Sequence, residues 1–434
     1  MHRLLLAFLL LTAPAQAQSN AAAIDTAIHT ILEGVDDPTT AALATLRDLH
    51  DPASIAPLIQ MLFWTDTAPP VVATLEALTG AHPGTTFFDW MVWQQDHENP
   101  PYPGYAALIT ELLTGLDPNY ARFLRPGIAH TIRLEELAWG GVNVNAIPPL
   151  DNPKLLAAAA ATYLNDDDLV FGVSLNGDNR AYPLRIMNWH EMANDVVGGI
   201  PLSLAYCTLC GAGILYDGRV EGAPAAVTFA TSGLLYRSNK LMFDRLSESL
   251  WDQFTGRPVI GPLANTPVRL RQLPLVTDSW GHWRAIHPDT RVLSPETGYS
   301  RDYRPDTAYR AYFASPDLAF PAAIHNRSLR PKDIVFGLEA PGGRKSWPLD
   351  GIDLIEDHVG LLDVILLGTP STRTVRAYAA TGHRFVRTNE NTLQSDDGTW
   401  TITDDALIGP NQQSLPRLPG HLAYWFAWNG FIGD

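Results

Sequence analysis

Cysteine is nearly absent from this chain: Cys207 and Cys210 are the only two among 434 residues. Both lie far from the N-terminus, so no cysteine is placed there to carry a lipid anchor. After the first residues, no stretch is long and apolar enough to cross a bilayer without charged side chains. We therefore expect no membrane insertion.

Basic residues are also scarce, since 30 Lys and Arg stand against 46 Asp and Glu, and the formal net charge is −16. This acidic balance argues against nucleic acid and anionic membrane surfaces as partners. Two common catalytic patterns are missing as well. No glycine-rich phosphate loop lies between a strand and a helix, and Ser232-Gly233 has no G-x-S-x-G context.

The first 17 residues have the features of a secretory signal peptide. Arg3 supplies a short basic start, residues 4–11 are apolar, and Ala15-Gln16-Ala17 offers small residues for cleavage. The apolar run is too short to span a membrane. The sequence therefore predicts a periplasmic or secreted protein that is cleaved near Ala17.

Residues 18–125 are predicted to form an all-α domain. Apolar residues recur at helical spacing in 42–49, 55–62 and 71–78. The unit around Asp51-Pro52 resembles a HEAT-type repeat, with a helix, an Asp-Pro turn and a second helix. This HEAT-like domain would support the rest of the chain or bind a protein partner. Residues 126–164 would connect it to the next domain.

From about residue 165 the chain becomes β-rich, and an internal match appears. Residues 170–184 and 335–349 are identical at six positions without a gap, and both have the strand–turn–strand pattern of a hairpin. The sequence therefore predicts a multidomain protein whose mainly-β part is built from two tandem pseudo-repeats, at 165–300 and 330–434. The second repeat lacks both cysteines and has Ile355 as its nearest match to His190.

Cys207 ends an apolar strand at 200–206, and a second strand-like run follows Gly211. The C-x-x-C-G pattern resembles the hairpin turn of rubredoxins and zinc ribbons, in which the glycine takes a positive φ. Three interpretations remain open: half of a metal site, a redox dithiol, or an inert bridge. In the redox case Cys207 attacks and Cys210 resolves.

A metal site needs further ligands, and His190 and Met242 are the candidates. Two thiolates, an imidazole and a thioether favour copper, especially Cu(I), whereas zinc is the alternative if oxygen or nitrogen completes the site. We place His190 in a short helix at 188–195. Both residues could instead belong to the core, as a hydrogen-bonded imidazole and an apolar filler.

Acidic and basic neighbours could support this site. Glu191 could orient His190 or act as a general acid/base, or it could be a solvated helix residue. Asp244 and Arg245 most simply form an ion pair with each other. The predicted site residues are Cys207, Cys210 and Glu191 for catalysis, Cys207, Cys210, His190 and Met242 for metal binding, and Asn194, Asp195, Asp244 and Arg245 as their supports.

The pattern of these residues resembles a family known as domain of unknown function 3179, over roughly residues 165–434. The family pattern has proline where this chain has Thr208. The resemblance implies that Cys207, Cys210, His190 and Met242 belong to one site, and it implies no activity. The residues that carry it are Ala181-Tyr182-Pro183, His190-Glu191, Asn194-Asp195, Gly198-Gly199, Pro201, Tyr206-Cys207, Leu209-Cys210-Gly211, Thr231–Leu234, Ser238, Met242, Asp244-Arg245, Ser249, Trp251, Gln253, Gly256 and the terminal Trp425–Trp428.

Overall fold

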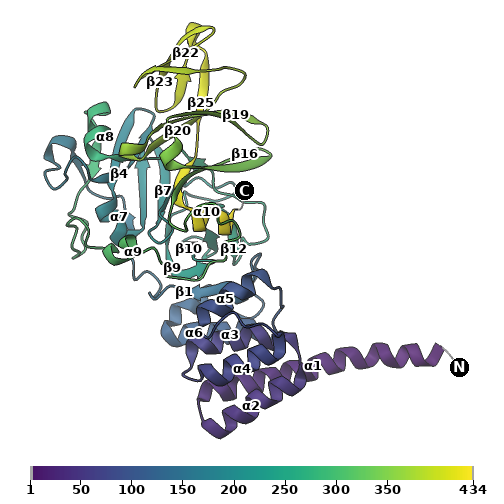
Figure 1. The fold of residues 1–434 in the computed structure, drawn as a ribbon. Coiled ribbons are helices and arrows are strands. Elements are labelled where there is room, and N and C mark those ends of the chain that lie inside the picture. Colours follow the sequence, from purple (N-terminus) through teal and green to yellow (C-terminus); the bar gives the residue numbers. More distant parts are fainter. Residues whose placement is uncertain (1–2, 433–434) are drawn as a thin grey trace. The chain divides into compact units, whose positions relative to one another are not determined.

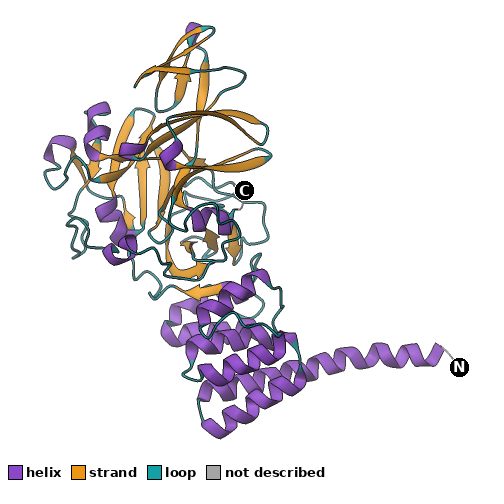
Figure 2. Ribbon diagram, in the orientation of Figure 1, coloured by secondary structure: helices purple, strands orange, loops and turns teal. Residues whose placement is uncertain are grey.

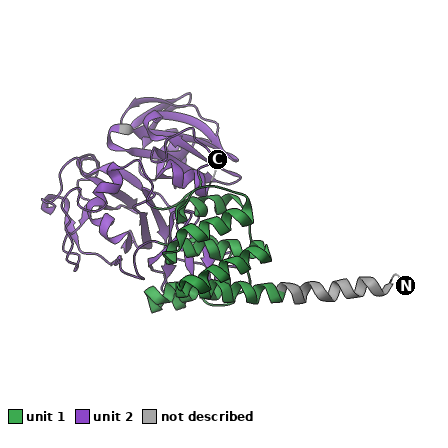
Figure 3. Cartoon of the chain, turned by 60° about the horizontal axis from the view of Figure 1, so that its bottom comes forward, with its two compact units in different colours: residues 1–139, 320–323 green, residues 140–319, 324–434 purple. Residues whose placement is uncertain are grey.

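The computed structural model describes residues 3–432, with residues 3–17 and Pro370 described by their backbone alone. The chain divides into two compact units (Figure 3). Unit 1 comprises residues 1–139 with 320–323, and unit 2 comprises residues 140–319 with 324–434. Figure 2 shows unit 1 mainly as helices and unit 2 mainly as strands. A helical region at 18–122 followed by a mainly-β region is therefore established.

Unit 1 confirms the three helices expected from apolar spacing, at α2, α3 and α4. The Asp-Pro turn lies between α2 and α3, where the Asp51 carboxylate accepts the Ala53 N–H at 3.0 Å and caps a short 3-10 turn. The helices are α1 (Arg3–Glu33), α2 (Asp36–Leu49), α3 (Ile55–Trp64), α4 (Ala68–Thr79), α5 (Phe87–Asp96) and α6 (Tyr105–Leu116).

The predicted signal peptide, residues 1–17, lies outside the residues whose side chains the structure describes. Within the described part of the chain, no helix has both the length and the apolar character needed to cross a membrane.

Unit 2 contains the sheets that position the candidate site (Figure 1). Three sheets lie in its first part, and their strand orders are β9-β10-β11-β12, β13-β8-β7-β6-β2 and β14-β4-β5-β15-β3. The strands are β2 (Leu150–Asp151), β3 (Leu155–Ala157), β4 (Leu169–Leu175), β5 (Asp178–Pro183), β6 (Met192–Val197), β7 (Ile200–Cys207), β8 (Ala212–Asp217), β9 (Phe229–Tyr236), β10 (Asn239–Asp244), β11 (Leu250–Asp252), β12 (Pro258–Ile260), β13 (Gln272–Leu273), β14 (Val276–Ser279) and β15 (Arg291–Leu293).

The second part of unit 2 has one sheet of three strands, β17-β16-β26, and one of eight, β18-β19-β20-β25-β24-β23-β22-β21. The strands are β16 (Ile334–Ala340), β17 (Gly343–Pro348), β18 (Leu354–Val359), β19 (Leu362–Thr369), β20 (Thr374–Ala379), β21 (Val386–Asn389), β22 (Thr392–Ser395), β23 (Gly398–Ile402), β24 (Ala406–Ile408), β25 (Ser414–Leu418) and β26 (His421–Tyr424). Both predicted hairpins, β4–β5 and β16–β17, are confirmed.

Two parts of the sequence interpretation change. The helix expected at 188–195 is instead α7 (Leu184–His190), followed directly by β6. Glu191 has a positive φ of 57°, which ends the helix, and pairing with β7 then satisfies the backbone of residues 192–197. The connecting segment at 126–164 also contributes β2, which pairs with β6, and β3, which pairs with β15.

A large buried apolar core lies in the first part of unit 2. Phe171 of β4, Ile186 of α7 and Leu204 of β7 all belong to it. This core holds the end of α7 against the sheet that carries the cysteines. Consequently His190 and Glu191, the last helical residue and the residue after it, have defined positions beside β7.

Candidate functional site

The two cysteines lie in the turn between β7 and β8, as the sequence predicts. Cys207 pairs with Ala212 at the end of the hairpin, and Gly211 has a φ of 60°. The expected positive φ is therefore confirmed, and a Cβ at this glycine would also come within 3.1 Å of the Tyr424 ring. Cys207 and Cys210 are joined as a disulfide, with their Cα atoms 5.2 Å apart.

The two sulfurs have different polar neighbours. Cys207 Sγ accepts the backbone N–H of Cys210 at 3.3 Å. Cys210 Sγ instead faces oxygen acceptors, the Ser238 carbonyl at 3.5 Å and Asn239 Oδ1 at 3.4 Å. Both cysteines are buried, with exposed fractions of 3% and 0%. One sulfur thus meets a donor and the other meets acceptors.

A buried ion pair lies beside the turn. Lys240 Nζ is 2.9 Å from Glu191 Oε2, and it donates to the backbone carbonyls of Glu191 at 3.2 Å and Tyr206 at 3.1 Å. Burial lowers the pKa of Lys240, and the adjacent carboxylate opposes that shift. Because Tyr206 precedes Cys207, this pair ties the end of α7 to the strand that carries the first sulfur.

Two tyrosine hydroxyls bond to the turn or to Glu191 beside it. Tyr309 donates to Glu191 Oε1 at 3.2 Å, and Thr208 donates to the same oxygen at 3.1 Å. Tyr312, in the short helix α9 (Arg310–Ala314), donates to the Leu209 carbonyl at 2.7 Å. The segment that bears these two tyrosines is therefore hydrogen-bonded to the disulfide turn and to Glu191 beside it.

His190 does not join the cysteines. Its Nδ1 contacts the Pro148 carbonyl at 2.8 Å, and its Nε2 contacts the Tyr303 hydroxyl at 2.5 Å. Burial lowers the pKa of His190, which favours the neutral ring. A carbonyl can only accept, so Nδ1 carries the proton and Nε2 accepts from Tyr303. Both ring nitrogens are thus occupied by protein groups.

Met242, Asp244 and Arg245 serve other contacts. Met242 is fully buried in β10, where it pairs with Thr231 and Trp251 on the neighbouring strands. The expected ion pair between Asp244 and Arg245 is wrong. Asp244 accepts from the Trp251 indole at 2.8 Å and from backbone N–H groups of the following turn. Both carboxylate oxygens of Asp244 thus accept hydrogen bonds from these groups. Arg245 pairs instead with Asp151 at 2.8 Å.

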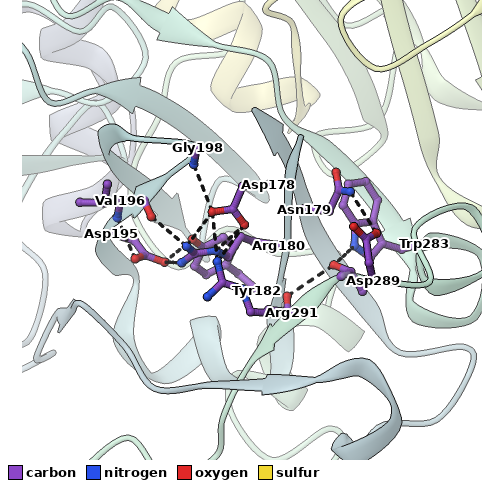
Figure 4. Close-up of polar contacts among 11 residues, drawn as sticks. Asp178, Asn179, Arg180, Tyr182, Asp195, Val196, Gly198, Trp283, Asp289 and Arg291 are labelled. Atoms are coloured by element: carbon purple, nitrogen blue, oxygen red, sulfur yellow. Dashed lines mark hydrogen bonds and ion pairs between the residues drawn. The ribbon is translucent and has the colours of Figure 1, made fainter. Parts of the chain in front are cut away.

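Asn194 and Asp195 point into two different networks. Asn194 donates to Asp151 Oδ1 at 2.7 Å and accepts from the Ser203 hydroxyl at 2.6 Å. Asp195 accepts from Arg180 at 2.8 Å and from the Tyr182 hydroxyl at 2.7 Å (Figure 4). Neither side chain supports the disulfide; Asp195 belongs to a buried structural ion pair.

The four predicted metal ligands are therefore not free to bind one copper or zinc ion together in the oxidised structure. The two sulfurs are joined to each other, and both nitrogens of His190 are already bonded to Pro148 and Tyr303. Among the residues that the structure describes, no group of three or more His, Cys, Asp or Glu side chains is arranged to hold a metal ion.

Sequence reasoning missed several residues around the cysteines, namely Asn239, Lys240, Tyr309 and Tyr312. One signal was available: Lys240 directly precedes the apolar residues Leu241-Met242-Phe243 in a β-rich part of the chain. A lysine there must be buried or point outward, and a buried lysine needs a carboxylate partner. The tyrosines lie about 100 residues away in sequence, and no local pattern connects them to the turn.

Comparison with known proteins identifies a family. The family model described as "Protein of unknown function (DUF3179)" matches residues 144–434. The comparisons with curated proteins and with solved structures found no match.

Proposed function

Because the chain belongs to the DUF3179 family, whose description assigns no function, we propose from the geometry that Cys207 and Cys210 are a thiol–disulfide redox couple. The observation that carries this proposal is the unequal environment of the two sulfurs. A donor N–H at Cys207 stabilises a thiolate, whereas the acceptors at Cys210 stabilise a protonated thiol. Cys207 is thus the attacking sulfur and Cys210 the resolving one.

The reaction follows from these roles. In the reduced protein, the Cys207 thiolate attacks one sulfur of a partner disulfide, forms a mixed disulfide and releases one partner thiolate. Cys210 then loses its proton and attacks Cys207 Sγ, which forms the internal disulfide and releases the second partner thiolate. The two released thiolates take up the protons that the cysteines lost. Two electrons pass to the partner, and the reverse sequence oxidises a partner dithiol.

Glu191 acts in this proposal as a positioning residue. Its carboxylate oxygens accept from Thr208, Tyr309 and Lys240, and this bonding leaves Glu191 poorly placed to exchange protons with a sulfur. The Glu191–Lys240 pair is neutral overall, so it contributes little net charge at Cys207. It holds the turn against the end of α7.

The decisive measurement is the reduction potential of the pair, from alkylation after equilibration in thiol–disulfide buffers. Redox-active proteins fall between about −120 and −270 mV, whereas structural bridges lie below about −300 mV. A value in the first range supports the couple. A potential below about −300 mV favours the alternative, a non-enzymatic binding module whose hairpin is braced by the disulfide. In that case a Cys207→Ser/Cys210→Ser variant should lose stability but still bind its partner.

Two single variants test the assignment of roles. Cys210→Ser leaves Cys207 with its N–H donor and should form a stable mixed disulfide with oxidised glutathione. Cys207→Ser leaves Cys210 among acceptors and should react at least tenfold more slowly. Equal rates for the two variants, with both folded by circular dichroism, would contradict the assignment.

Copper binding by the reduced protein is the second proposal, and zinc is its alternative. Two thiolates that converge in one turn are soft ligands, and the resting bonds of His190 would have to break before it could join them. Stoichiometric copper in protein reduced and purified without chelator, lost in a Cys207→Ser/Cys210→Ser variant, would favour this function over redox exchange.

We also infer that the β-rich part arose by tandem duplication. Support comes from a repeated polar contact: Arg180 and Tyr182 donate to Asp195, as Lys345 and Trp347 do to Asp357. A repeated packing contact adds to it. A side chain at Gly172 would collide with the Trp283 indole, and one at Gly337 with the Trp428 indole. The second repeat would be the scaffold.

Export and the HEAT-like character of unit 1 complete the proposal. A disulfide suits the oxidising compartment that the signal-like N-terminus predicts. Cell fractionation with mass spectrometry of the mature N-terminus would test cleavage near Ala17. The helical domain is proposed as a support or a protein-binding element, and co-purification with and without residues 18–122 would separate these roles.

A further inference from the structure

We propose a second site in unit 2, separate from the disulfide: a polar cavity that binds a neutral, polyhydroxylated small molecule of the sugar class. The cavity has a volume of about 230 Å³. It lies where the β2–β3 segment meets the loop after β15. Its polar lining consists of Asp151, Asn152, Lys154, Ser294, Thr297 and Tyr299.

A chain of hydrogen bonds leads from buried His190 to the cavity wall. Tyr303 donates to His190 Nε2, so its oxygen can accept from the Thr297 hydroxyl 2.6 Å away. Thr297 in turn accepts the Tyr299 backbone N–H at 3.3 Å. The Tyr299 ring lies 5.3 Å from the His190 ring, centroid to centroid. His190 therefore orders two lining residues.

Asp151 is held from two sides. Asn194 donates to its Oδ1 at 2.7 Å, and Arg245 donates to its Oδ2 at 2.8 Å. Each carboxylate oxygen can still accept one more hydrogen bond, because an ionised carboxylate has about four lone-pair positions. His190, Asn194 and Arg245, which the sequence offered as parts of a metal site, thus converge on this cavity.

The charges at the cavity favour a neutral ligand. Asp151 pairs with Arg245, and Lys154 pairs with Glu296, so the formal charges of these four residues cancel. What remains for a ligand are hydroxyl, amide and carboxylate groups, which match the hydroxyls of a sugar. Tyr299, 45% exposed, offers an aromatic face against which the C–H side of a sugar ring can pack. The volume suits a single small ring rather than a chain.

This site does not depend on the redox proposal. His190 and Glu191 are neighbours in sequence, but their side chains bond to different groups. One reaches the cavity through Tyr303, and the other reaches the disulfide turn through Thr208. The result of one test therefore does not decide the other.

The experiment is saturation-transfer NMR on the full chain with D-glucose, D-galactose, D-mannose and N-acetyl-D-glucosamine. We expect at least one sugar to bind, with at least tenfold weaker affinity in Tyr299→Ala and in Thr297→Val. The Thr297 variant keeps the side-chain shape and removes the hydroxyl. Leu361→Ala, at an 89% exposed leucine of the second β-rich part, is the control and should bind as the wild type does.

Three outcomes would overturn the proposal. None of the four sugars binds the wild-type chain; a sugar binds but does so equally well in both cavity variants; or D-glucuronate binds more tightly than D-glucose, which would point to an anion site. Melting temperatures of all variants within a few degrees of the wild type ensure that lost binding reflects the cavity.

Discussion

Residues 169–217 and residues 334–379 pass through the same order of elements, but only the first stretch carries the cysteines. Each has a strand pair, a short helical segment and three more antiparallel strands. The helical segments differ: α7 has seven residues, whereas the second is a three-residue 3-10 turn, Leu349–Gly351. The strands thus form a common frame, and the two cysteines lie at the end of β7 and in the turn that follows it.

The two corresponding turns sharpen this contrast. Four residues separate the paired strand ends in each turn, and the last of the four, Gly211 or Arg373, has a φ of 60°. Where the first turn has its disulfide, the second has a hydrogen bond from the Thr372 hydroxyl to the Thr369 carbonyl at 3.2 Å. The turn can therefore close without sulfur, which argues that the thiols do more than brace the hairpin.

The largest expected difference concerns the repeated polar contact. Asp195 and Arg180 are each 7% exposed, whereas Asp357 is 25% and Lys345 is 44% exposed. Asp195→Ala leaves the buried guanidinium of Arg180 with Asp178 as its one carboxylate partner and leaves the buried Tyr182 hydroxyl without its acceptor, so it should cost about 2–3 kcal/mol of unfolding free energy. Asp357→Ala breaks a partly solvated pair and should cost about 1 kcal/mol. Urea unfolding of both variants measures the two losses of unfolding free energy. Equal losses would show that burial does not set the strength of this contact.

Acid should weaken the first stretch through a residue that the second lacks, since Gly343 stands where Asp178 does. Burial alone would raise the pKa of Asp178, but hydrogen bonds from Arg180, the Gly198 N–H and Arg291 lower it to about 2. A folded-state pKa below the unfolded value of about 4 stabilises the protein above pH 4. This stabilisation, about 2 kcal/mol, is lost as pH falls from about 4 to 2.

The variant Asp178→Asn isolates this effect. Its stability should be lower than that of the wild type at pH 6, and most of this gap should close by pH 2, because the folded wild-type carboxyl is then about half protonated and the unfolded one almost fully protonated. Other acids titrate in both proteins and cancel in the difference. A gap that stays constant from pH 6 to pH 2 would show that the contribution does not come from ionised Asp178.

Local pattern sufficed to predict the hairpins, the first helices and the positive φ at Gly211, because turns and amphipathic spacing are written in neighbouring residues. It failed after His190, where strand pairing with β7 overrode helical spacing. It also misaligned the two stretches. Counting back from Met192 and Leu354, which begin the corresponding strands, puts Ile352 rather than Ile355 in the place of His190.

The site itself was only half predictable. The spacing of Cys207 and Cys210 predicted that they share one turn but left a metal site, a redox dithiol and an inert bridge open. The direction of His190 depends on Pro148 and Tyr303, which lie 42 and 113 residues away. Such contacts arise from the packing of separate sheets and loops. Residue type alone therefore grouped His190 with the two cysteines, whereas in the structure His190 bonds to Pro148 and Tyr303 and the two sulfurs bond to each other.

Replacing the two cysteines of the first turn with the threonines of the second gives the most direct test of the comparison. In Cys207→Thr/Cys210→Thr, a threonine hydroxyl at 210 can close the turn as Thr372 does. We expect a folded protein that loses about 2 kcal/mol, the contribution of a very short disulfide loop, and all thiol–disulfide exchange. The wild type in excess dithiothreitol is the matched control, because its reduced turn should lose a similar amount. If the variant fails to fold while the reduced wild type stays folded, the sulfur atoms are needed for packing even without their bond. The proposal of a redox couple would then depend on the measured reduction potential alone.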